Sequence, residues 1–197
     1  MTNPEQYRAL KERAVVGAIA PRKTIGVAGK DRAGYLQGLL TNDIQALTAG
    51  TGCYAAWLTP QGRMLTDLHV FESGDRMLLD VPADALHATL QRLDQFLFSE
   101  DVQLADLSET LDAVWIHGPA ASSVLEEALT GAAGLASWPE YHNSRVEFGG
   151  SPVVAARVSQ LGVPGFVVYV ESARRPDLEH ALVDRGAVAA DPAAIEA

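Results

Sequence analysis

Two spacings of apolar residues alternate along the chain, and their alternation predicts the order of strands and helices. The first twenty residues have a helical spacing, with apolar positions at Tyr7, Leu10, Ala14 and Ile19. Apolar runs too short for a helix, bounded by glycine, proline or polar residues, predict strands. These runs are residues 24–28, 77–81, 102–105, 111–117, 145–148, 152–158, 165–170 and 187–190.

Helical spacing returns in four later segments. Asp31 can cap a helix that carries Tyr35, Leu36, Leu39 and Leu40. The other three are expected from Pro82 through Leu97, from Pro119 through Leu129 and from Pro176 to Arg185. Pro192 is expected to begin a further helix, of which the sequence holds the first turn. Two strands followed by a helix thus occur at residues 63–97 and 152–185. This order favours an α+β fold, in which antiparallel sheets have helices packed on one side.

The stretch from Gly52 to Phe71 reads as a β-hairpin. Thr59-Pro60-Gln61-Gly62 has the chemistry of a tight turn, since proline presets φ at its second position. If the turn is centred between residues 60 and 61, the numbers of paired residues sum to 121, which places Tyr54 opposite Asp67. On its own strand Asp67 then shares a face with Leu65, His69 and Phe71. The pattern is equally typical of an exposed aspartate on an edge strand.

Composition narrows the class of protein. The 197 residues suffice for one large or two small domains with a real core, and 48% hydrophobic with 20% charged residues is typical of a soluble globular chain. A net charge of −10, with no dense run of Lys or Arg, argues against nucleic-acid binding. Cys53 is the single cysteine, so the chain has no internal disulfide. With no signal pattern and no long apolar run, a cytoplasmic setting without membrane contact is expected.

Several familiar catalytic patterns fail on inspection. Gly29-Lys30 lacks the earlier glycine and the following Ser or Thr of a phosphate loop. The five histidines show no metal-binding spacing, and Ser122 stands too far after Gly118 for a nucleophile elbow. Cys53 is interpreted as a small buried hydrophobe. No metal site is therefore expected.

The remaining chemistry lies in the hairpin. A buried acid beside aromatic side chains suits a heteroaromatic ligand with N–H donors, because the carboxyl accepts from the ring nitrogen while Tyr54 or Trp57 offers a flat wall. Asp67 would also serve in proton transfer if burial raised its pKa. The alternative is that Tyr54, Trp57 and Asp67 are residues of the core and the sheet surface.

Three motifs in order resemble one known family. L-L-T-N-D-I at 39–44, the run 52–71 and I-H-G-P at 116–119 resemble the folate-binding domain shared by the glycine-cleavage aminomethyltransferases and the YgfZ-type proteins. The resemblance implies that Tyr54 and Asp67 contact the tetrahydrofolate ring system, with Trp57 and Asn42 as further candidates. In an aminomethyltransferase Asp67 would be catalytic, by orienting or assisting the folate nitrogen that receives the one-carbon unit.

The resemblance departs from the transferase branch in the later hairpin. Transferases resemble Y-T-G-E-x-G-F-E there, whereas residues 159–168 read S-Q-L-G-V-P-G-F-V-V, with Val163 and Val167 in place of the glutamates. The forms Q-G-R-M-L-T-D and T-N-D-I are more similar to the YgfZ branch. That branch implies a folate-binding accessory protein for the assembly or repair of iron–sulfur clusters, with iron–sulfur proteins as clients.

The end of the sequence is a second departure. P-A-A-I-E-A at 192–197 resembles the start of a segment that leads, in the family, to the motif K-G-C-Y-x-G-Q-E and a C-terminal β-barrel. We therefore expect one folate-binding domain over residues 1–197, divisible into sub-domains 1–110 and 111–197, without that barrel. Three functions stay open: the tetrahydrofolate-binding accessory protein, an aminomethyltransferase that transfers a one-carbon unit to tetrahydrofolate, and a scaffold that has lost folate.

Overall fold

The structure is a computed structural model that describes residues 4–17 and 20–190. The chain divides into two compact units. Unit 1 consists of residues 1–20 and 110–197, and unit 2 of residues 21–109. The expected sub-domains 1–110 and 111–197 differ from these units, because residues 1–20 belong to the same unit as residues 110–197. Both units combine antiparallel strands with helices, which confirms the predicted α+β class.

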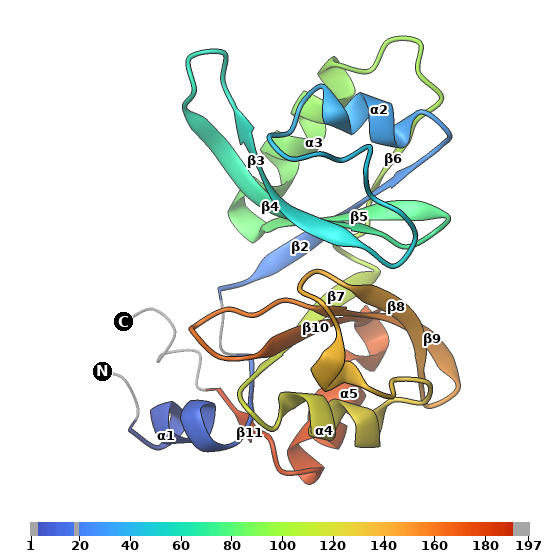
Figure 1. The fold of residues 1–197 in the computed structure, drawn as a ribbon. Helices are drawn as coiled ribbons and strands as arrows, with labels where there is room; N and C mark the ends of the chain where they lie inside the picture. The colour runs from blue at the N-terminus through green and yellow to red at the C-terminus, as the bar shows by residue number, and fades with distance from the viewer. Residues whose placement is uncertain (1–3, 18–19, 191–197) are drawn as a thin grey trace. The chain divides into compact units, whose positions relative to one another are not determined.

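Unit 2 is built on a five-stranded antiparallel sheet, the upper sheet in Figure 1. The order of its strands is β3-β4-β5-β2-β6. The strands are β2 (Arg22–Ala28), β3 (Gly52–Leu58), β4 (Met64–Glu72), β5 (Arg76–Pro82) and β6 (Gln103–Asp106). Strands β2, β5 and β6 were predicted from short apolar runs, and β3 and β4 as the hairpin at residues 52–71, with ends that agree to within two residues.

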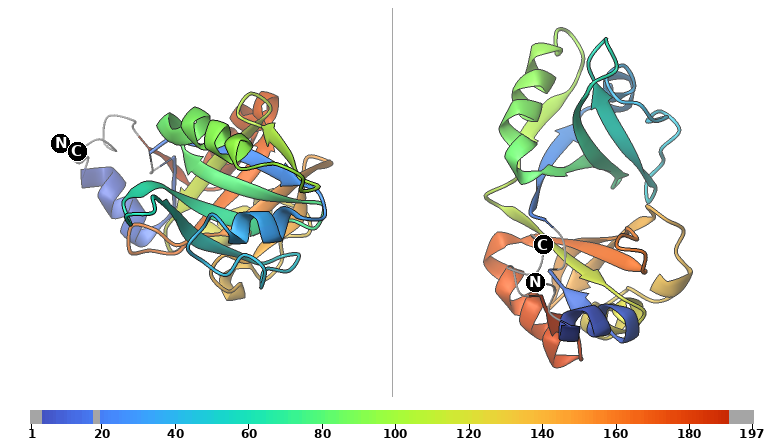
Figure 2. Two further views of the ribbon diagram at one scale, coloured as in Figure 1. Left: turned by 90° about the horizontal axis from the view of Figure 1, so that it is seen from above. Right: turned by 90° about the vertical axis from the view of Figure 1, so that its left-hand side faces the viewer.

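Helices cover one face of this sheet. They are α2 (Arg32–Gln37), the 3₁₀ turn η1 (Ala83–Ala85) and α3 (Leu86–Gln95). Figure 2 shows α3 running along the sheet, where Leu86 and Leu93 join a core with Ile25, Val27 and Leu79. Asp31 lies at the N-cap position of α2 without a capping hydrogen bond, and its carboxylate instead accepts from the backbone N–H of Asp101.

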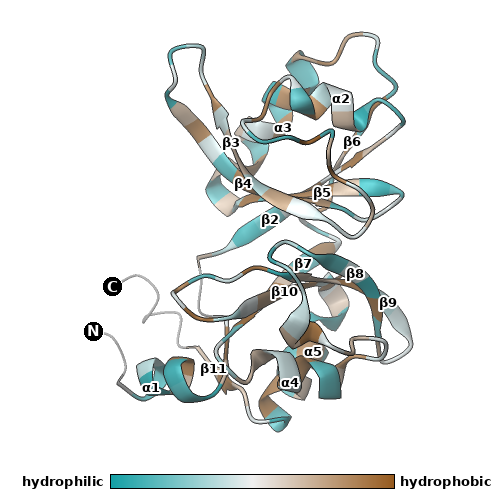
Figure 3. Cartoon of the chain, in the orientation of Figure 1, coloured by the Kyte–Doolittle hydropathy of each residue, from teal (hydrophilic) through white to brown (hydrophobic). Residues whose placement is uncertain are grey.

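Unit 1 contains a six-stranded sheet with the order β11-β1-β7-β10-β9-β8. The strands are β1 (Val15–Val16), β7 (Leu111–His117), β8 (Asn143–Phe148), β9 (Ser151–Arg157), β10 (Gly165–Glu171) and β11 (Val188–Ala189). The central strands carry long hydrophobic stretches (Figure 3), and six of the seven residues of β10 are buried. Strands β1 and β11 pair in parallel, whereas the other pairs are antiparallel.

The helices of unit 1 are α1 (Pro4–Glu12), α4 (Ala121–Ala128) and α5 (Arg175–Asp184), together with the 3₁₀ turns η2 (Leu135–Ser137) and η3 (Ser172–Arg174). Helices α4 and α5 pack their apolar sides on this sheet. Leu125 of α4 and Leu178 of α5 are fully buried in the core with Ile116. The predicted helix over the first twenty residues ends at Glu12, because Val15 and Val16 pair with β7 and β11 instead. Ile19 and the turn expected at Pro192 lie outside the described residues.

The hairpin of β3 and β4 forms as predicted, but its register is different. Tyr54 lies opposite His69, and Asp67 lies opposite Ala56, so the predicted Tyr54–Asp67 pairing is wrong. Two extra residues cause the shift. The Thr59 N–H donates to the Arg63 carbonyl and closes a loop of residues 60–62, one residue longer than predicted, in which Gly62 has a positive φ. The second extra residue is Leu65, which forms a β-bulge where the register changes. Since a shift of two residues preserves side-chain alternation, Asp67 and Tyr54 still share a face.

Candidate functional site

A line of polar and aromatic side chains crosses four strands of unit 2 on the face opposite its helices. The cross-strand pairs are Tyr54 with His69, His69 with Asp80, and Asp80 with Thr24. Because directly paired residues point to the same side of a sheet, these four side chains follow one another across β3, β4, β5 and β2. Asp67 lies two residues from His69 on β4, beside this line.

Arg22 of β2 joins the two aspartates of this face. Its Nε donates to Oδ2 of Asp80 at 2.5 Å, and its Nη2 donates to the Asp80 carbonyl oxygen at 2.7 Å. The remaining terminal nitrogen, Nη1, lies 3.2 Å from Oδ2 of Asp67. Asp80 Oδ2 also lies 3.0 Å from Nδ1 of His69. We call Arg22, Asp67, His69 and Asp80, together with Tyr54, the polar cluster.

Exposure of the charged side chains increases along the cluster towards Asp67. The Asp80 side chain is fully buried, that of Arg22 is 11% exposed and that of Asp67 is 26% exposed. Burial by itself lowers the pKa of the Arg22 guanidinium, but attraction and hydrogen bonding to Asp80 and then to Asp67 outweigh burial, so the pKa is raised. Arg22 is therefore a permanent cation between two carboxylates, of which Asp67 is the accessible one.

Tyr54 supplies an aromatic surface next to the accessible carboxylate. It is 44% exposed, and its ring lies 5.7 Å from the His69 ring. Asn42 holds this part of β3 from outside the sheet, because its side-chain N–H₂ donates to the Tyr54 carbonyl at 2.8 Å. The structure thus brings three of the four residues predicted from the sequence to one region: Asp67 and Tyr54 by their side chains, and Asn42 through the backbone of Tyr54.

Trp57 is the predicted site residue that the structure does not bring to the polar cluster. It is 4% exposed and belongs to the hydrophobic core on the helix-covered face, where its ring lies 6.2 Å from that of Phe96. The reason is its position, because Trp57 pairs with Thr66 and therefore points to the opposite side of the sheet from Asp67. An aromatic wall for a ligand at Asp67 must come from Tyr54.

Sequence reasoning placed His69 on the face of Asp67 without making it a site residue, and it missed Arg22 and Asp80. A signal was present at Asp80, which interrupts the apolar run Met77–Val81 with a single charge. A charged residue inside a buried strand requires a partner of opposite charge. The partner, Arg22, is 58 residues away in sequence, and only the pairing of β2 with β5 brings the two together.

The cluster has the chemistry of a site for hydrogen-bond donors on a flat ring. It presents one partly exposed carboxylate, one buried carboxylate, a fixed cation and an exposed phenol. Within residues 4–17 and 20–190, no group of three or more His, Cys, Asp or Glu is arranged to hold a metal ion. In the same residues no helix combines the length and apolarity needed to cross a membrane.

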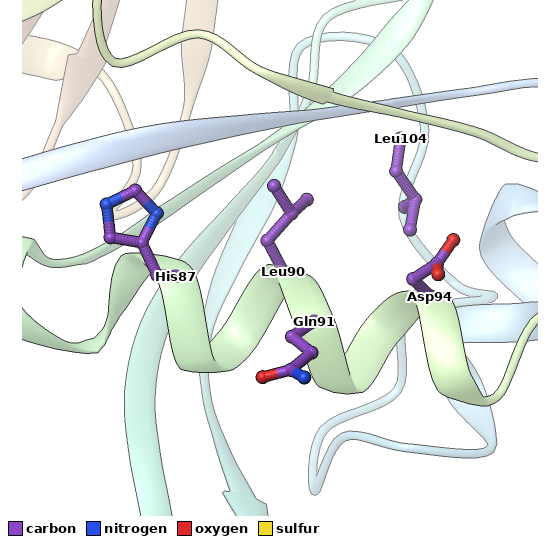
Figure 4. Close-up of a pocket in the computed structure, with 5 residues that line it drawn as sticks. All are labelled: His87, Leu90, Gln91, Asp94 and Leu104. Atoms are coloured by element: carbon purple, nitrogen blue, oxygen red, sulfur yellow. The ribbon is translucent and has the colours of Figure 1, made fainter.

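A separate surface hollow of about 370 Å³ lies between α3 and β6. Its lining residues are His87, Leu90, Gln91, Asp94 and Leu104 (Figure 4). Leu104 pairs with Val27, a residue of the core, so the hollow is on the helix-covered side of the sheet. It is therefore on the opposite side from the polar cluster and contributes nothing to it.

The two valines that depart from the transferase motif lie in unit 1. Val163 closes a tight turn, in which its N–H donates to the Gln160 carbonyl at 3.1 Å. Val167 is fully buried in β10 opposite Trp115. A glutamate at position 167 would place a charge in this buried environment, so the valine matches its surroundings.

Comparison with known proteins finds one family across almost the whole chain. A family model described as the GCVT N-terminal domain matches residues 3–197. The aminomethyltransferase of Bacillus subtilis (strain 168) is 26% identical over 183 residues, which cover 92% of this chain and 50% of that protein. The aminomethyltransferase of Rubrobacter xylanophilus is 26% identical over 185 residues, or 94% of this chain and 49% of that protein. The chain thus spans about half the length of the curated relatives it matches.

Two solved structures have a similar fold. The glycine cleavage system aminomethyltransferase T from Bartonella henselae superposes with a TM-score of 0.84 at 21% identity, over 99% of this chain and 54% of that one. A chain of the heterotetrameric sarcosine oxidase from Corynebacterium sp. U-96 superposes with a TM-score of 0.62 at 19% identity, over 87% of this chain and 83% of that one. At these identities the likeness concerns the fold.

Proposed function

The chain belongs to the GCVT N-terminal domain family, and from this membership we propose that it binds a reduced folate at the polar cluster of unit 2. Asp67 accepts hydrogen bonds from N–H groups of the pterin ring, and the exposed ring of Tyr54 packs on its flat surface. The observation that carries this proposal is the accessible carboxylate of Asp67, held by Arg22 on the same face as the exposed Tyr54.

The residues of the cluster fit such a ligand. A pterin is a planar heteroaromatic ring with several N–H donors, and an ionised carboxylate is a pure acceptor. A partly exposed phenol ring beside it offers aromatic contact area together with a polar end. Asn42 positions Tyr54 through its backbone, which makes it a supporting residue, whereas Trp57 belongs to the core.

We propose aminomethyl transfer as the activity in which this chain takes part. The matched relatives in Bacillus subtilis and Rubrobacter xylanophilus are named aminomethyltransferases, which favours the transferase alternative over the accessory role in iron–sulfur assembly. In that activity a folate nitrogen receives a one-carbon unit, and Asp67 would orient that nitrogen or accept its proton. Because the chain spans about half the length of these relatives, that it carries out the complete reaction is itself proposed.

The YgfZ-type reading is a second proposal, and it rests on Val163 and Val167. Neither residue can supply the carboxylates that the transferase motif places in the later hairpin, and Val167 is buried. On this reading the chain binds a reduced folate in support of iron–sulfur proteins in the cytoplasm. A scaffold without folate is the third candidate.

Calorimetric titration with 5-formyltetrahydrofolate, a stable reduced folate, tests the shared step. We expect the 197-residue protein to bind it and Asp67→Asn to bind at least tenfold more weakly, because the amide presents an N–H₂ donor and no charge. Asp75→Asn, an exposed aspartate in the turn between β4 and β5, is the matched control and should bind as the parent does. Absence of binding by the parent would leave only the scaffold, and equal binding by Asp67→Asn would remove Asp67 from the site.

A second assay separates the two folate functions. The protein is mixed with tetrahydrofolate and a carrier protein loaded with an aminomethyl group, and methylenetetrahydrofolate is measured. Production that depends on this chain and on Asp67 supports the transferase. Binding without production supports the accessory role, which predicts lower activity of iron–sulfur enzymes in cells that lack the protein.

A further inference from the structure

We propose that Arg22 is the positioning residue of the folate site, and that the buried carboxylate of Asp80 holds it so that Asp67 is presented as a charged acceptor. This inference rests on the proposed function, because it assigns a role at the same site. Nothing in the motifs around Asp67 pointed to Arg22, which lies 45 residues earlier in the sequence.

Arg22 is attached to Asp80 at two points. Two guanidinium nitrogens bind Asp80, Nε at the carboxylate and Nη2 at the backbone carbonyl. Because Asp80 is fully buried in the middle of the sheet, it fixes the plane and direction of the guanidinium. The His69 ring, 3.0 Å from the same Asp80 oxygen, limits the movement of that carboxylate. Arg22 is thus oriented by groups that a ligand at Asp67 does not touch.

Arg22 also reaches Asp67. Nη1 is the terminal nitrogen that Asp80 leaves unused, and it lies 3.2 Å from Oδ2 of Asp67. A fixed cation at this distance attracts the carboxylate and restricts its rotation. The other charged or titratable groups on this face are Tyr54 on β3, His69 on β4 and Asp80 on β5. Arg22 is the permanent cation within hydrogen-bond distance of Asp67, so the direction of the Asp67 carboxylate depends on it.

Only a guanidinium performs both tasks, binding Asp80 and reaching Asp67. Arginine has five N–H donors in a rigid fork, which allows two nitrogens to bind Asp80 while a third reaches Asp67. The ammonium of lysine is a single centre on a flexible stem, so it cannot hold both carboxylates in this geometry. Arg22→Lys therefore keeps the charge and loses the positioning, whereas Arg22→Met loses both.

The experiment measures two properties of the protein and of Arg22→Lys and Arg22→Met. The first is the affinity for 5-formyltetrahydrofolate at pH 7. The second, which needs no folate, is the rate at which a water-soluble carbodiimide modifies Asp67 at one fixed pH, followed by peptide mass spectrometry. Because the hydrogen bond from Arg22 occupies Oδ2 of Asp67, this rate reports on whether the carboxylate is held in place.

Arg32 provides the matched control. It is a partly buried arginine of the same unit, and its Nε lies 3.0 Å from the buried Glu72, away from the polar cluster. Arg32→Met also removes an arginine that binds a buried acid, so it should cost stability to a similar degree. We expect Arg32→Met to bind folate with the parent's affinity and Asp67 to be modified in it at the parent's rate. Near-ultraviolet circular dichroism verifies the fold of each variant.

We expect Arg22→Met to bind folate at least tenfold more weakly at pH 7, a loss typical of one charge-assisted hydrogen bond. The carbodiimide should modify Asp67 faster than in the parent, because Oδ2 has lost its hydrogen bond from Arg22. Arg22→Lys should also bind folate more weakly than the parent, because it keeps the charge and loses the positioning. If Arg22→Met fails to fold, the folate affinity of Arg22→Lys tests the proposal. Parental affinity in Arg22→Lys would overturn the positioning role.

The two proposals fail in different ways. A parent that binds no folate removes the proposed function, while the carbodiimide rate still tests the link from Arg22 to Asp67. If the parent binds folate, and Arg22→Met has the parent's affinity and the parent's Asp67 reactivity, the role of Arg22 is overturned. Folate binding by the protein then stands.

Discussion

His117 packs directly over the backbone of Gly165, its partner across strands β7 and β10. A Cβ atom on residue 165 would lie 2.6 Å from the carbonyl oxygen of Val158 and would also overlap the His117 ring. Two residues earlier on β7, the Trp115 ring is parallel to the His117 ring, at a centroid distance of 5.9 Å. The fully buried imidazole is therefore enclosed by backbone and aromatic surface, and two predictions depend on this.

Gly165→Ala should destabilise the protein by about 3 kcal/mol or more, because neither the Val158 backbone nor the enclosed ring can move away without disturbing the sheet. The measurement is the free energy of unfolding from urea denaturation. Gly34→Ala is the control, since a Cβ there meets only the Gln45 side chain at an ordinary 3.5 Å inside helix α2. That substitution should be neutral or stabilise by about 0.5–1 kcal/mol.

His117 should make the protein less stable in acid. Burial lowers its pKa from 6.5 to about 4, so between these pH values the unfolded chain binds a proton that the folded chain does not. The contribution is fully present above pH 6.5 and is lost as the pH falls to about 4, in total roughly 3 kcal/mol. The free energy of unfolding of the parent, measured at intervals from pH 4 to pH 7.5, should show this slope.

The histidine variants isolate that effect from other titrating groups. His117→Gln should be less dependent on pH over the same interval, by the amount assigned to His117. The exposed His180, replaced by Gln, should retain the slope of the parent. A parent and a His117→Gln variant with parallel profiles would show that protonation of His117 is not linked to unfolding.

Asp80→Asn should cost about 3 kcal/mol of stability, because it leaves the Arg22 guanidinium in a buried position with Asp67 as its remaining charged partner. Thermal and urea unfolding measure the loss. Asp75→Asn removes the carboxylate of an ion pair with Arg76, in which both side chains are nearly half exposed, and should change stability by less than about 0.5 kcal/mol. A loss below about 1 kcal/mol for Asp80→Asn would mean that the buried pair has no stabilising role.

Cys53 should react slowly with thiol reagents in the folded protein. Burial, and to a smaller extent the nearby Asp43, raise the pKa of its thiol to about 11. At pH 8 the reactive thiolate is then roughly 100-fold scarcer than for a thiol at its ordinary pKa. Alkylation by a maleimide at pH 8, compared with the same reaction in urea, measures this protection. Folded and unfolded rates within tenfold of each other would contradict it.

Much of the fold was predictable because strands and helices each have a recognisable local spacing of apolar residues. The strand at Leu111–His117 has the predicted ends, and the leucines at helical spacing correctly placed α3. The two-residue strand Val15–Val16 was not predictable, since a run so short has no periodicity and forms only through its partners. Its neighbour β11 comes from the other end of the chain, at a sequence separation that no local pattern encodes.

The candidate site was predictable in part. Asp67 and Tyr54 were found because both lie in one hairpin, where alternation assigns them to one face. Arg22 and Asp80 come from other strands, and their proximity depends on the pairing of β2 with β5. Trp57 was wrongly predicted to join Asp67 and Tyr54 because its aromatic ring suggested a ligand. By alternation it is on the opposite side of β3 from Tyr54, and there it lies in the core.

The loop at residues 59–63 and the bulge at Leu65 have a consequence for engineering this hairpin. Each adds one residue to the register, and together they keep Asp67 and His69 on the side where Arg22 lies. Inserting or deleting an odd number of residues would exchange the two sides of β4. Asp67 and His69 would then enter the apolar core, and Leu68 and Val70 would leave it. Insertions and deletions in this hairpin should therefore be tolerated only in even numbers.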